Sequence, residues 1–187
     1  MSKTDIVIIL FTVVYGLLLT HLFSGLNKLF RKQSSIKWHW LPLLTAWYLL
    51  LIILKNWWNL VFAPADEEWF NIIFFVVYGH LLFLIFLAVS SVLPDKVPEM
   101  GMDLESYFFH NYRYFWGVMA AIVLISGAIT VIRELTLGMP LNIWIVVTTS
   151  VLFLLHLLLA VRKSYRLTMV LVPLFTLVTL WEIIDKI

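Results

Sequence analysis

Six long apolar runs occupy nearly the whole chain, and the short connections between them carry most of its charge. Each run is close to the roughly 20 residues that an α-helix needs to cross ~30 Å of hydrocarbon. The runs cover residues 6–26, 38–62, 70–93, 114–132, 141–161 and 167–184. The chain is therefore predicted to be all-α, an integral membrane helical bundle with about six transmembrane helices.

The composition supports the same class of protein. Apolar residues (AVILMFWYC) make up 63% of the chain and charged residues 13%, against about 45–50% and about 25% in soluble domains. A soluble domain of this length cannot bury so much apolar surface, so lipid must cover the outer face. The net charge of +2 and the absence of a long Lys/Arg run argue against binding to nucleic acid. The absence of cysteine excludes disulfides, Cys-ligated metals and thiol nucleophiles.

Residues 1–187 are predicted to form a single transmembrane domain, because no Gly/Ser-rich or Pro-rich linker interrupts them. Two short segments recur along the chain. Val13–Gly16 is repeated as Val76–Gly79, and Pro42–Thr45 is echoed by Pro173–Thr176. These echoes suggest three helical hairpins in parallel orientation, with chance similarity between Leu/Val-rich segments as the alternative.

The basic residues divide the connections into two groups. The second connection contains no Lys or Arg and the fourth contains only Arg133, whereas the first, third and fifth are basic. Their basic residues are Lys28, Arg31, Lys32, Lys37, Lys96, Arg113, Arg162, Lys163 and Arg166. Because cytoplasmic loops collect Lys and Arg, these three connections are predicted to lie inside and both termini outside, in the periplasm of a Gram-negative bacterium.

Tryptophan residues lie near the ends of the runs, where their amphipathic rings suit the headgroup layer. They are Trp38, Trp40, Trp57, Trp58, Trp69, Trp116, Trp144 and Trp181. An aromatic-rich cofactor pocket is the alternative interpretation. Lys55 is expected to snorkel to the outer interface, close to the acidic residues 66–68, as an anchor rather than a catalytic lysine.

The third connection is the only one long enough to have structure of its own. Seven of the fourteen residues in 103–116 are aromatic, and Asp103 is placed to cap a helix. We therefore expect an interfacial helix over about 103–113, lying in the plane of the membrane. The alternative is a lid over an inner vestibule.

Small residues on the fourth run indicate a helix-packing face. Gly117, Ala121 and Ala128 fall on one side of this helix, and such residues let membrane helices approach closely. A small bundle with few internal polar ties gains from further helix contacts, so we expect a homo-oligomer.

The centres of the runs lack the groups that pumps and hydrolases need. No Asp or Glu lies there, since Glu182 and Asp185 are at the outer end of the last run, and this disfavours a proton-coupled transporter. There is no Gly-rich filter segment, no Gly-x-Ser-x-Gly and no His-Glu-x-x-His motif, so an enzyme or a selective channel is disfavoured. Ser126 and the hydroxyls at 148–150 are expected to bond to preceding backbone carbonyls.

The histidines are the candidate site residues. His21 and His156 lie at similar depth near the inner ends of their runs, His39 and His110 lie on the same side, and His80 is midway along the third run. Paired imidazoles from different helices could bind haem b or a metal ion, principally His21 with His156. The alternative is that each imidazole simply hydrogen-bonds to a neighbouring helix or to headgroups.

The segment Gly16-x3-Thr20-His21-Leu22-x-Ser24-Gly25-Leu26, with the basic loop and Trp-rich span that follow, resembles a family of small bacterial inner-membrane proteins of about six spans. The segment 103–117, which begins Asp103-Leu104-Glu105, belongs to the same resemblance. It extends over most of the chain. The function of that family is unknown, so the resemblance implies a bacterial inner membrane and no catalytic residue.

Two functions follow from the sequence. The first is a non-enzymatic multi-pass membrane protein acting in permeation, in sensing or as a membrane partner of other proteins. A small apolar ligand such as a quinone or a lipid could lie among Tyr15, Tyr78 and the tryptophans. The second is a membrane redox protein that holds haem b or a metal through the inner histidines. Either site is expected beneath 103–116, at the inner ends of the spans.

Overall fold

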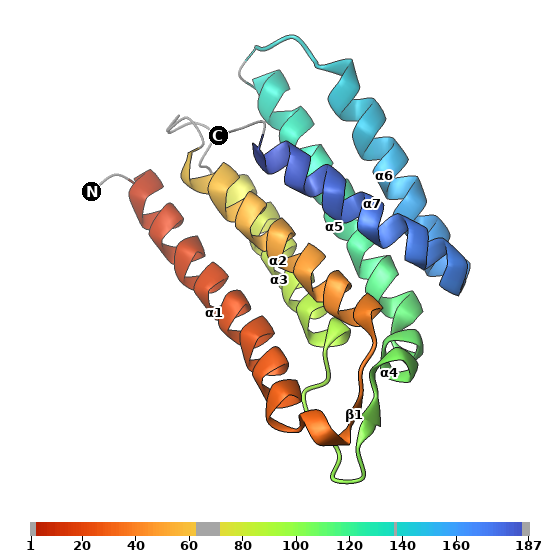
Figure 1. The fold of residues 1–187 in the computed structure, drawn as a ribbon. Helices are drawn as coiled ribbons and strands as arrows, with labels where there is room; N and C mark the ends of the chain where they lie inside the picture. The colour runs from red at the N-terminus through yellow and green to blue at the C-terminus, as the bar shows by residue number, and fades with distance from the viewer. Residues whose placement is uncertain (1–2, 63–71, 137, 185–187) are drawn as a thin grey trace.

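The computed structural model describes residues 3–62, 72–136 and 138–184, and it is almost entirely helical (Figure 1). The helices are α1 (Lys3–Arg31), α2 (Trp40–Val61), α3 (Ile72–Val92), α4 (Leu104–His110), α5 (Tyr112–Thr136), α6 (Ile143–Val161) and α7 (Tyr165–Ile184). A short 3-10 helix (Gln33–Ser35) and two strands, β1 (Ile36–Lys37) and β2 (Met102–Asp103), complete the described elements. Six helices, all except α4, are long and apolar enough to cross a membrane. The prediction of an all-α membrane bundle is confirmed.

Side chains in the connections fix where several helices begin. His39 caps α2 by accepting the N–H of Leu41 at 3.3 Å, and Asn142 caps α6 by accepting the N–H of Trp144 at 3.0 Å. Asp103 accepts two N–H groups of α4 at 2.9 and 3.1 Å, so its predicted capping role is confirmed. These contacts satisfy donors that the first turn of a helix leaves unpaired.

The first, third and fifth connections meet at one end of the bundle, which we call the strand end. There β1 and β2 pair in parallel, with Ile36 opposite Met102, a feature that the all-α prediction lacks. Tyr165, at the start of α7, joins the same end through a hydrogen bond to His39. α1 begins and α7 ends at the opposite end, the termini end (Figure 1). Which side of the membrane each end faces stays a prediction.

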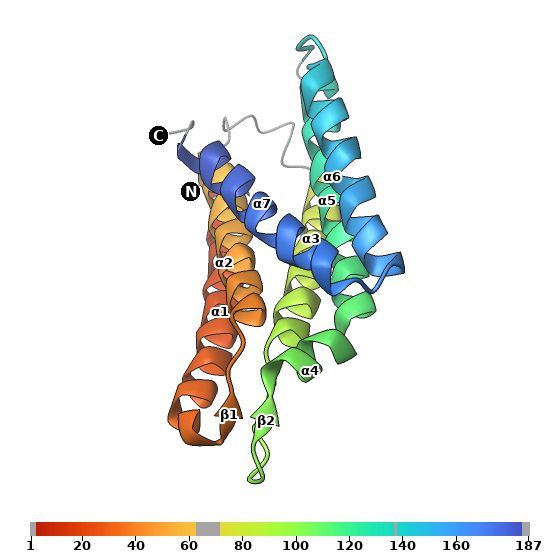
Figure 2. The same cartoon turned by 45° about the vertical axis from the view of Figure 1, so that its right-hand side comes forward.

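The helices do not pack as three equivalent hairpins. α5 lies along α6, and α3 packs against both α1 and α5. α7 crosses the bundle and packs mainly on α2 rather than on α6 (Figure 2). The expected third hairpin is therefore not closely packed. The two copies of the repeated segment, Val13–Gly16 and Val76–Gly79, do meet. The hydroxyls of Tyr15 and Tyr78 lie 2.8 Å apart.

The helix contact made by small residues differs from the predicted face. Space is open around Gly117, and Ala128 is exposed, whereas a Cβ at Gly127 would overlap the methyl group of Thr149 on α6. Gly127, one residue from the predicted position, is thus a point of close approach between α5 and α6. Small residues occur on more than one side of α5, so their spacing did not identify the face that meets α6.

The tryptophans near the helix ends fall into two groups. Trp144 and Trp181 are 72% and 70% exposed, as residues at a lipid interface would be. Trp116 is fully buried, so its expected place in an interfacial belt is wrong. It lies on the first turns of α5, where α4 ends at His110 and the chain bends into the bundle (Figure 2). Trp69 lies outside the described residues.

Candidate functional site

A cavity of about 460 Å³ lies between α2, α3, α5, α6 and α7, in the half of the bundle nearest the termini end. Pockets for small molecules typically measure ~300–1,000 Å³. It extends from Arg133 and Glu182, near the ends of α5 and α7, to Tyr48 and Phe175 at the middle of their helices. Its polar lining consists of Tyr48, Lys55, Asn56, Asn59, Tyr78, Ser126, Thr130, Arg133, Thr148, Thr149, Thr179 and Glu182. The site is thus at the opposite end from the one expected.

One ion pair lies in the wall of the cavity. The ammonium of Lys55 on α2 bonds to the Glu182 carboxylate on α7, and the two side chains are only 28% and 36% exposed. Lys55 was expected to reach the outer interface as an anchor. In the structure it joins α2 to α7 instead. The acidic residues 66–68, its expected neighbours, lie outside the described residues.

Arg133 gives the cavity an excess of positive charge. It lies in the last turn of α5, where a cation is favoured by the helix dipole. Within the residues that the structure describes, Arg133 forms no salt bridge. Lys55 and Arg133 bring two positive charges and Glu182 one negative charge, so the part of the lining that the structure describes has one net positive charge.

Hydroxyl groups on α5 and α6 add hydrogen-bonding capacity. Thr148 donates to the carbonyl of Trp144 at 2.7 Å and Thr130 to the carbonyl of Ser126 at 3.1 Å, as expected of hydroxyls in membrane helices. The Ser126 hydroxyl is different. It is buried and makes no hydrogen bond within the described part of the chain. The expectation that Ser126 bonds to a preceding carbonyl is therefore wrong.

The deep end of the cavity, which we call its floor, is formed by the aromatic rings of Tyr48 and Phe175, and both contact His156. The Tyr48 hydroxyl donates to His156 Nε2 at 3.2 Å, and His156 Nδ1 donates to the carbonyl of Leu152 at 2.7 Å. The imidazole is fully buried and stacks on Phe175, with ring centroids 4.2 Å apart and an interplanar angle of 10°. Both nitrogens of His156 are thus engaged, in a neutral tautomer that suits a buried imidazole.

The other candidate histidines occupy separate places. His21 donates to the Ser90 hydroxyl at 3.2 Å on α3, whereas His156 lies among α2, α5 and α7. His80 is exposed at the middle of α3, and His110 is exposed at the end of α4.

No hydrogen bond or ring contact joins any two of the five histidines, all of which the structure describes. The described residues also contain no group of three or more His, Cys, Asp or Glu side chains placed to hold a metal ion. Haem or metal binding through His21 and His156 stays a prediction.

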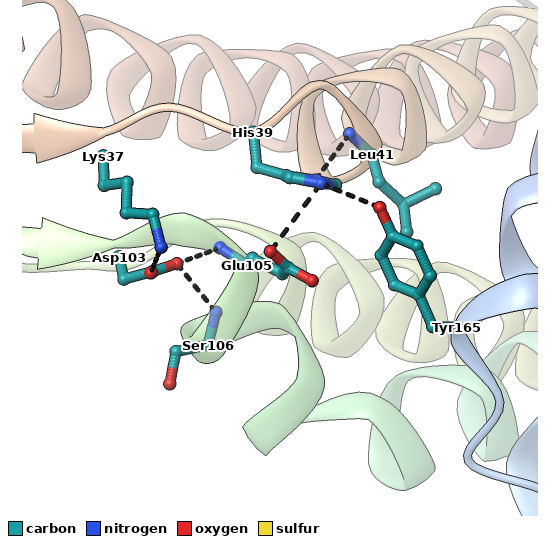
Figure 3. A network of polar contacts seen from close by, with 7 residues as sticks. All are labelled: Lys37, His39, Leu41, Asp103, Glu105, Ser106 and Tyr165. Atoms are coloured by element: carbon teal, nitrogen blue, oxygen red, sulfur yellow. Dashed lines mark hydrogen bonds and ion pairs between the residues drawn. The ribbon is translucent and has the colours of Figure 1, made fainter.

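The fifth histidine, His39, belongs to a polar network at the strand end (Figure 3). Its Nδ1 accepts the N–H that starts α2, so its Nε2 carries the proton. That nitrogen lies 3.2 Å from the Tyr165 hydroxyl and 3.8 Å from a Glu105 carboxylate oxygen. One side chain therefore connects α2, α4 and α7, which is a structural role.

A second ion pair in this network joins the two strands (Figure 3). Lys37 Nζ lies 2.7 Å from Asp103 Oδ2. The hydrogen bond from Lys37, followed by the N–H groups of α4, lowers the pKa of the Asp103 carboxyl, and the same bond raises the pKa of Lys37. Both residues stay charged at neutral pH and hold the first and third connections together.

Sequence reasoning missed the cavity, although a signal existed. On three helices, polar residues recur at helical spacing in the half nearest the termini end. They are Lys55, Asn56 and Asn59 on α2, Ser126, Thr130 and Arg133 on α5, and Thr179 and Glu182 on α7. Spacings of three and four residues place such side chains on one helix face. A search for polar faces, rather than for histidines, would have found them.

The fold and the cavity define a multi-pass helical membrane protein with a charged pocket in one half of its bundle. No protein-family model, curated protein or solved structure matches the chain.

Proposed function

We propose that the protein is a non-enzymatic membrane protein that binds a small molecule in the cavity near the termini end, as a sensor or a permeation pathway would. The observation that carries this proposal is the charged lining of a 460 Å³ cavity between otherwise apolar helices. Ionisable groups on membrane-spanning helices that face the bundle interior are markers of substrate or ion pathways. Lys55, Glu182 and Arg133 together suit that role better than a purely structural one.

The non-enzymatic part is supported by the state of the reactive groups in the lining. Lys55 bonds to Glu182 and is therefore not a free amine nucleophile. Ser126 is the hydroxyl best placed for attack, but among the described residues it has no hydrogen bond to a base. Hydroxyl nucleophiles need such a base for activation. Binding of a small molecule needs only charges and hydrogen-bond donors, which these groups supply without activation.

The charge distribution supports an orientation in a bacterial inner membrane. The strand end holds the three basic connections, which favours the cytoplasm for that end. The cavity then faces the periplasm, and its ligand reaches it from outside. A lipid bilayer is the partner that the six apolar helices require.

A homo-oligomer is supported by His80. This imidazole donates through Nδ1 to the carbonyl of Val76 at 2.7 Å and is exposed at the middle of α3. Contact with lipid would leave Nε2 unpaired. A second copy packed on this face of α3 would give it a partner. Cross-linking in membranes tests this: we expect dimers or larger species, and they should weaken in His80→Leu.

Native mass spectrometry tests the binding function. We expect the protein released from its membranes to carry a bound small molecule, and we expect that molecule to be lost when Ser126→Trp fills the cavity. Leu154→Trp, on the exposed outer face of α6, is the matched control and should keep it. Identical bound masses in all three proteins would contradict the proposal.

A further inference from the structure

We infer that the cavity selects a monoanion that carries an apolar group, with the charge held by Arg133 and the apolar part against the aromatic floor. This inference rests on the proposed binding function and adds the chemical class of the ligand. It follows from three features of the lining: its charge balance, its free donor and its graded polarity.

The charge balance favours an anion. Lys55 and Glu182 neutralise each other, while Arg133 has no ionic partner among the described residues. The planar guanidinium binds carboxylate or phosphate oxygens through two parallel hydrogen bonds. A cation would meet a net positive wall. A neutral ligand would leave the charge of the partly buried Arg133 without an ionic partner.

The free donor, the Ser126 hydroxyl, lies on the same face of α5 as Arg133. Ser126 and Thr130 precede it by seven and three residues, which places the three side chains along one stripe of the helix. Because the buried Ser126 hydroxyl has no partner within the described chain, it can donate to a bound oxygen. The stripe therefore offers a charged donor near the helix end and a neutral donor two turns deeper.

The polarity of the cavity changes along its depth. Arg133 and Glu182 lie near the termini end, whereas Ile52, Tyr48 and Phe175 line the deeper part. The ring of Phe175 stacks on His156 and on the Tyr48 ring, with centroids 4.2 and 5.9 Å away, and the His156 and Tyr48 rings stack on each other at 6.3 Å. Such a floor accepts an aromatic or aliphatic group. The ligand should thus be amphipathic, with its anionic group nearest the termini end.

Two sources supply this chemistry: a free carboxylate with an apolar group, or the phosphodiester of an anionic phospholipid. A single-cysteine assay distinguishes them, since the chain contains no cysteine. Thr149→Cys, in the cavity wall, is reconstituted in phosphatidylcholine liposomes and labelled with a water-soluble thiol reagent. Benzoate, benzyl alcohol and benzylammonium are then compared as protecting probes. A parallel arm replaces part of the lipid with phosphatidylglycerol and omits the probes.

Benzoate should slow labelling in a saturable manner, and benzylammonium and benzyl alcohol should not. Arg133→Gln should weaken protection by about 10- to 100-fold, because it removes a charge-assisted contact. Arg133→Lys should retain part of the protection, and Arg162→Gln at the strand end should retain all of it. If the ligand is a lipid, phosphatidylglycerol alone should slow labelling and Arg133→Gln should remove the effect.

Equal protection by benzylammonium, or an unchanged benzoate affinity in Arg133→Gln, would overturn the inference. So would the absence of protection by both monoanions. In each case the cavity would still be labelled, and the binding function would stand. Failure of Thr149→Cys to react in any liposome would instead count against the proposed function. Unprotected labelling of Arg133→Gln at the rate of the parent shows that this variant keeps the cavity intact.

Discussion

At the scale of single residues, the Lys55–Glu182 pair shows how the cavity is held together. Its two side chains are about one-third exposed, so the pair lies between two limits. Surface ion pairs contribute about 0–1 kcal/mol, and removal of one partner from a fully buried pair costs about 3–5 kcal/mol. We therefore expect an intermediate loss of unfolding free energy when one charge of the pair is removed and the other stays in the cavity.

We predict that Glu182→Gln lowers the free energy of unfolding by about 1–2 kcal/mol, because Lys55 loses its partner. Lys55→Met combined with Glu182→Gln should recover most of this loss. Denaturation in mixed micelles measures both values, and Glu99→Gln on the exposed third connection is the control. A double variant less stable than Glu182→Gln alone would contradict the role given to the pair.

A second residue-scale prediction concerns pH. The Lys37 hydrogen bond lowers the pKa of Asp103 in the folded protein below its ordinary value of 3.8. The folded state therefore favours the ionised carboxylate, and the stabilisation is present above that ordinary value. It is lost as the pH falls through the lower pKa of the folded state. Asp103→Asn keeps an oxygen that can cap α4 and removes the charge.

The stability difference between the parent and Asp103→Asn should accordingly be constant from pH 7 to about pH 5 and shrink below about pH 4. Thermal unfolding followed by tryptophan fluorescence measures it. A difference that does not shrink as the pH falls would contradict the ion pair with Lys37.

At the scale of helices, the contact of α5 with α6 includes a tight position at Gly127. We predict that Gly127→Ala lowers the free energy of unfolding by about 1–3 kcal/mol, because the new methyl group must displace Thr149. Gly117→Ala is the matched control. Nothing lies near its Cβ, and alanine favours a helix by up to ~1 kcal/mol. Equal stabilities of the two variants would refute the close approach at Gly127.

The helices themselves could be predicted from length and hydropathy, since lipid forces every backbone group into internal hydrogen bonds. Their neighbours could not be predicted, because these helices are apolar on nearly every face. Gly127 rather than Gly117 makes the contact, and Trp116 is inside rather than at the interface. The pairing of β1 with β2 depends on residues 66 positions apart, such as Lys37 and Asp103. Two-residue strands leave no periodic signal.

The candidate site was hard to predict because its residues lie far apart in the sequence. Its ion pair joins Lys55 to Glu182, 127 positions away, and the remaining lining is spread over five helices. Histidines attract attention because their chemistry is distinctive. Here His156 has both nitrogens satisfied in the core, and His39 caps a helix. The polar faces of α2, α5 and α7 carry the site instead.

At the scale of the whole molecule, the two ends of the bundle differ in structure. The strand end is closed by the β1–β2 pair and by the contacts of His39 and Lys37 (Figure 3). The half near the termini end contains the cavity. Such a division suits a protein that admits a molecule from one side while the other end stays fixed. Lys163, in the basic fifth connection, marks the side that we assign to the cytoplasm.

Thiol labelling of intact liposomes or spheroplasts tests this account most directly. We predict that Thr149→Cys reacts quickly with a membrane-impermeant reagent added outside, whereas Leu154→Cys, 60% exposed on the apolar face of α6, hardly reacts. Thiols in lipid are neither hydrated nor ionised. Lys163→Cys should react only after the membrane is opened. Equal, slow labelling at positions 149 and 154 would mean that no water-filled cavity opens outward, and the central claim would be contradicted.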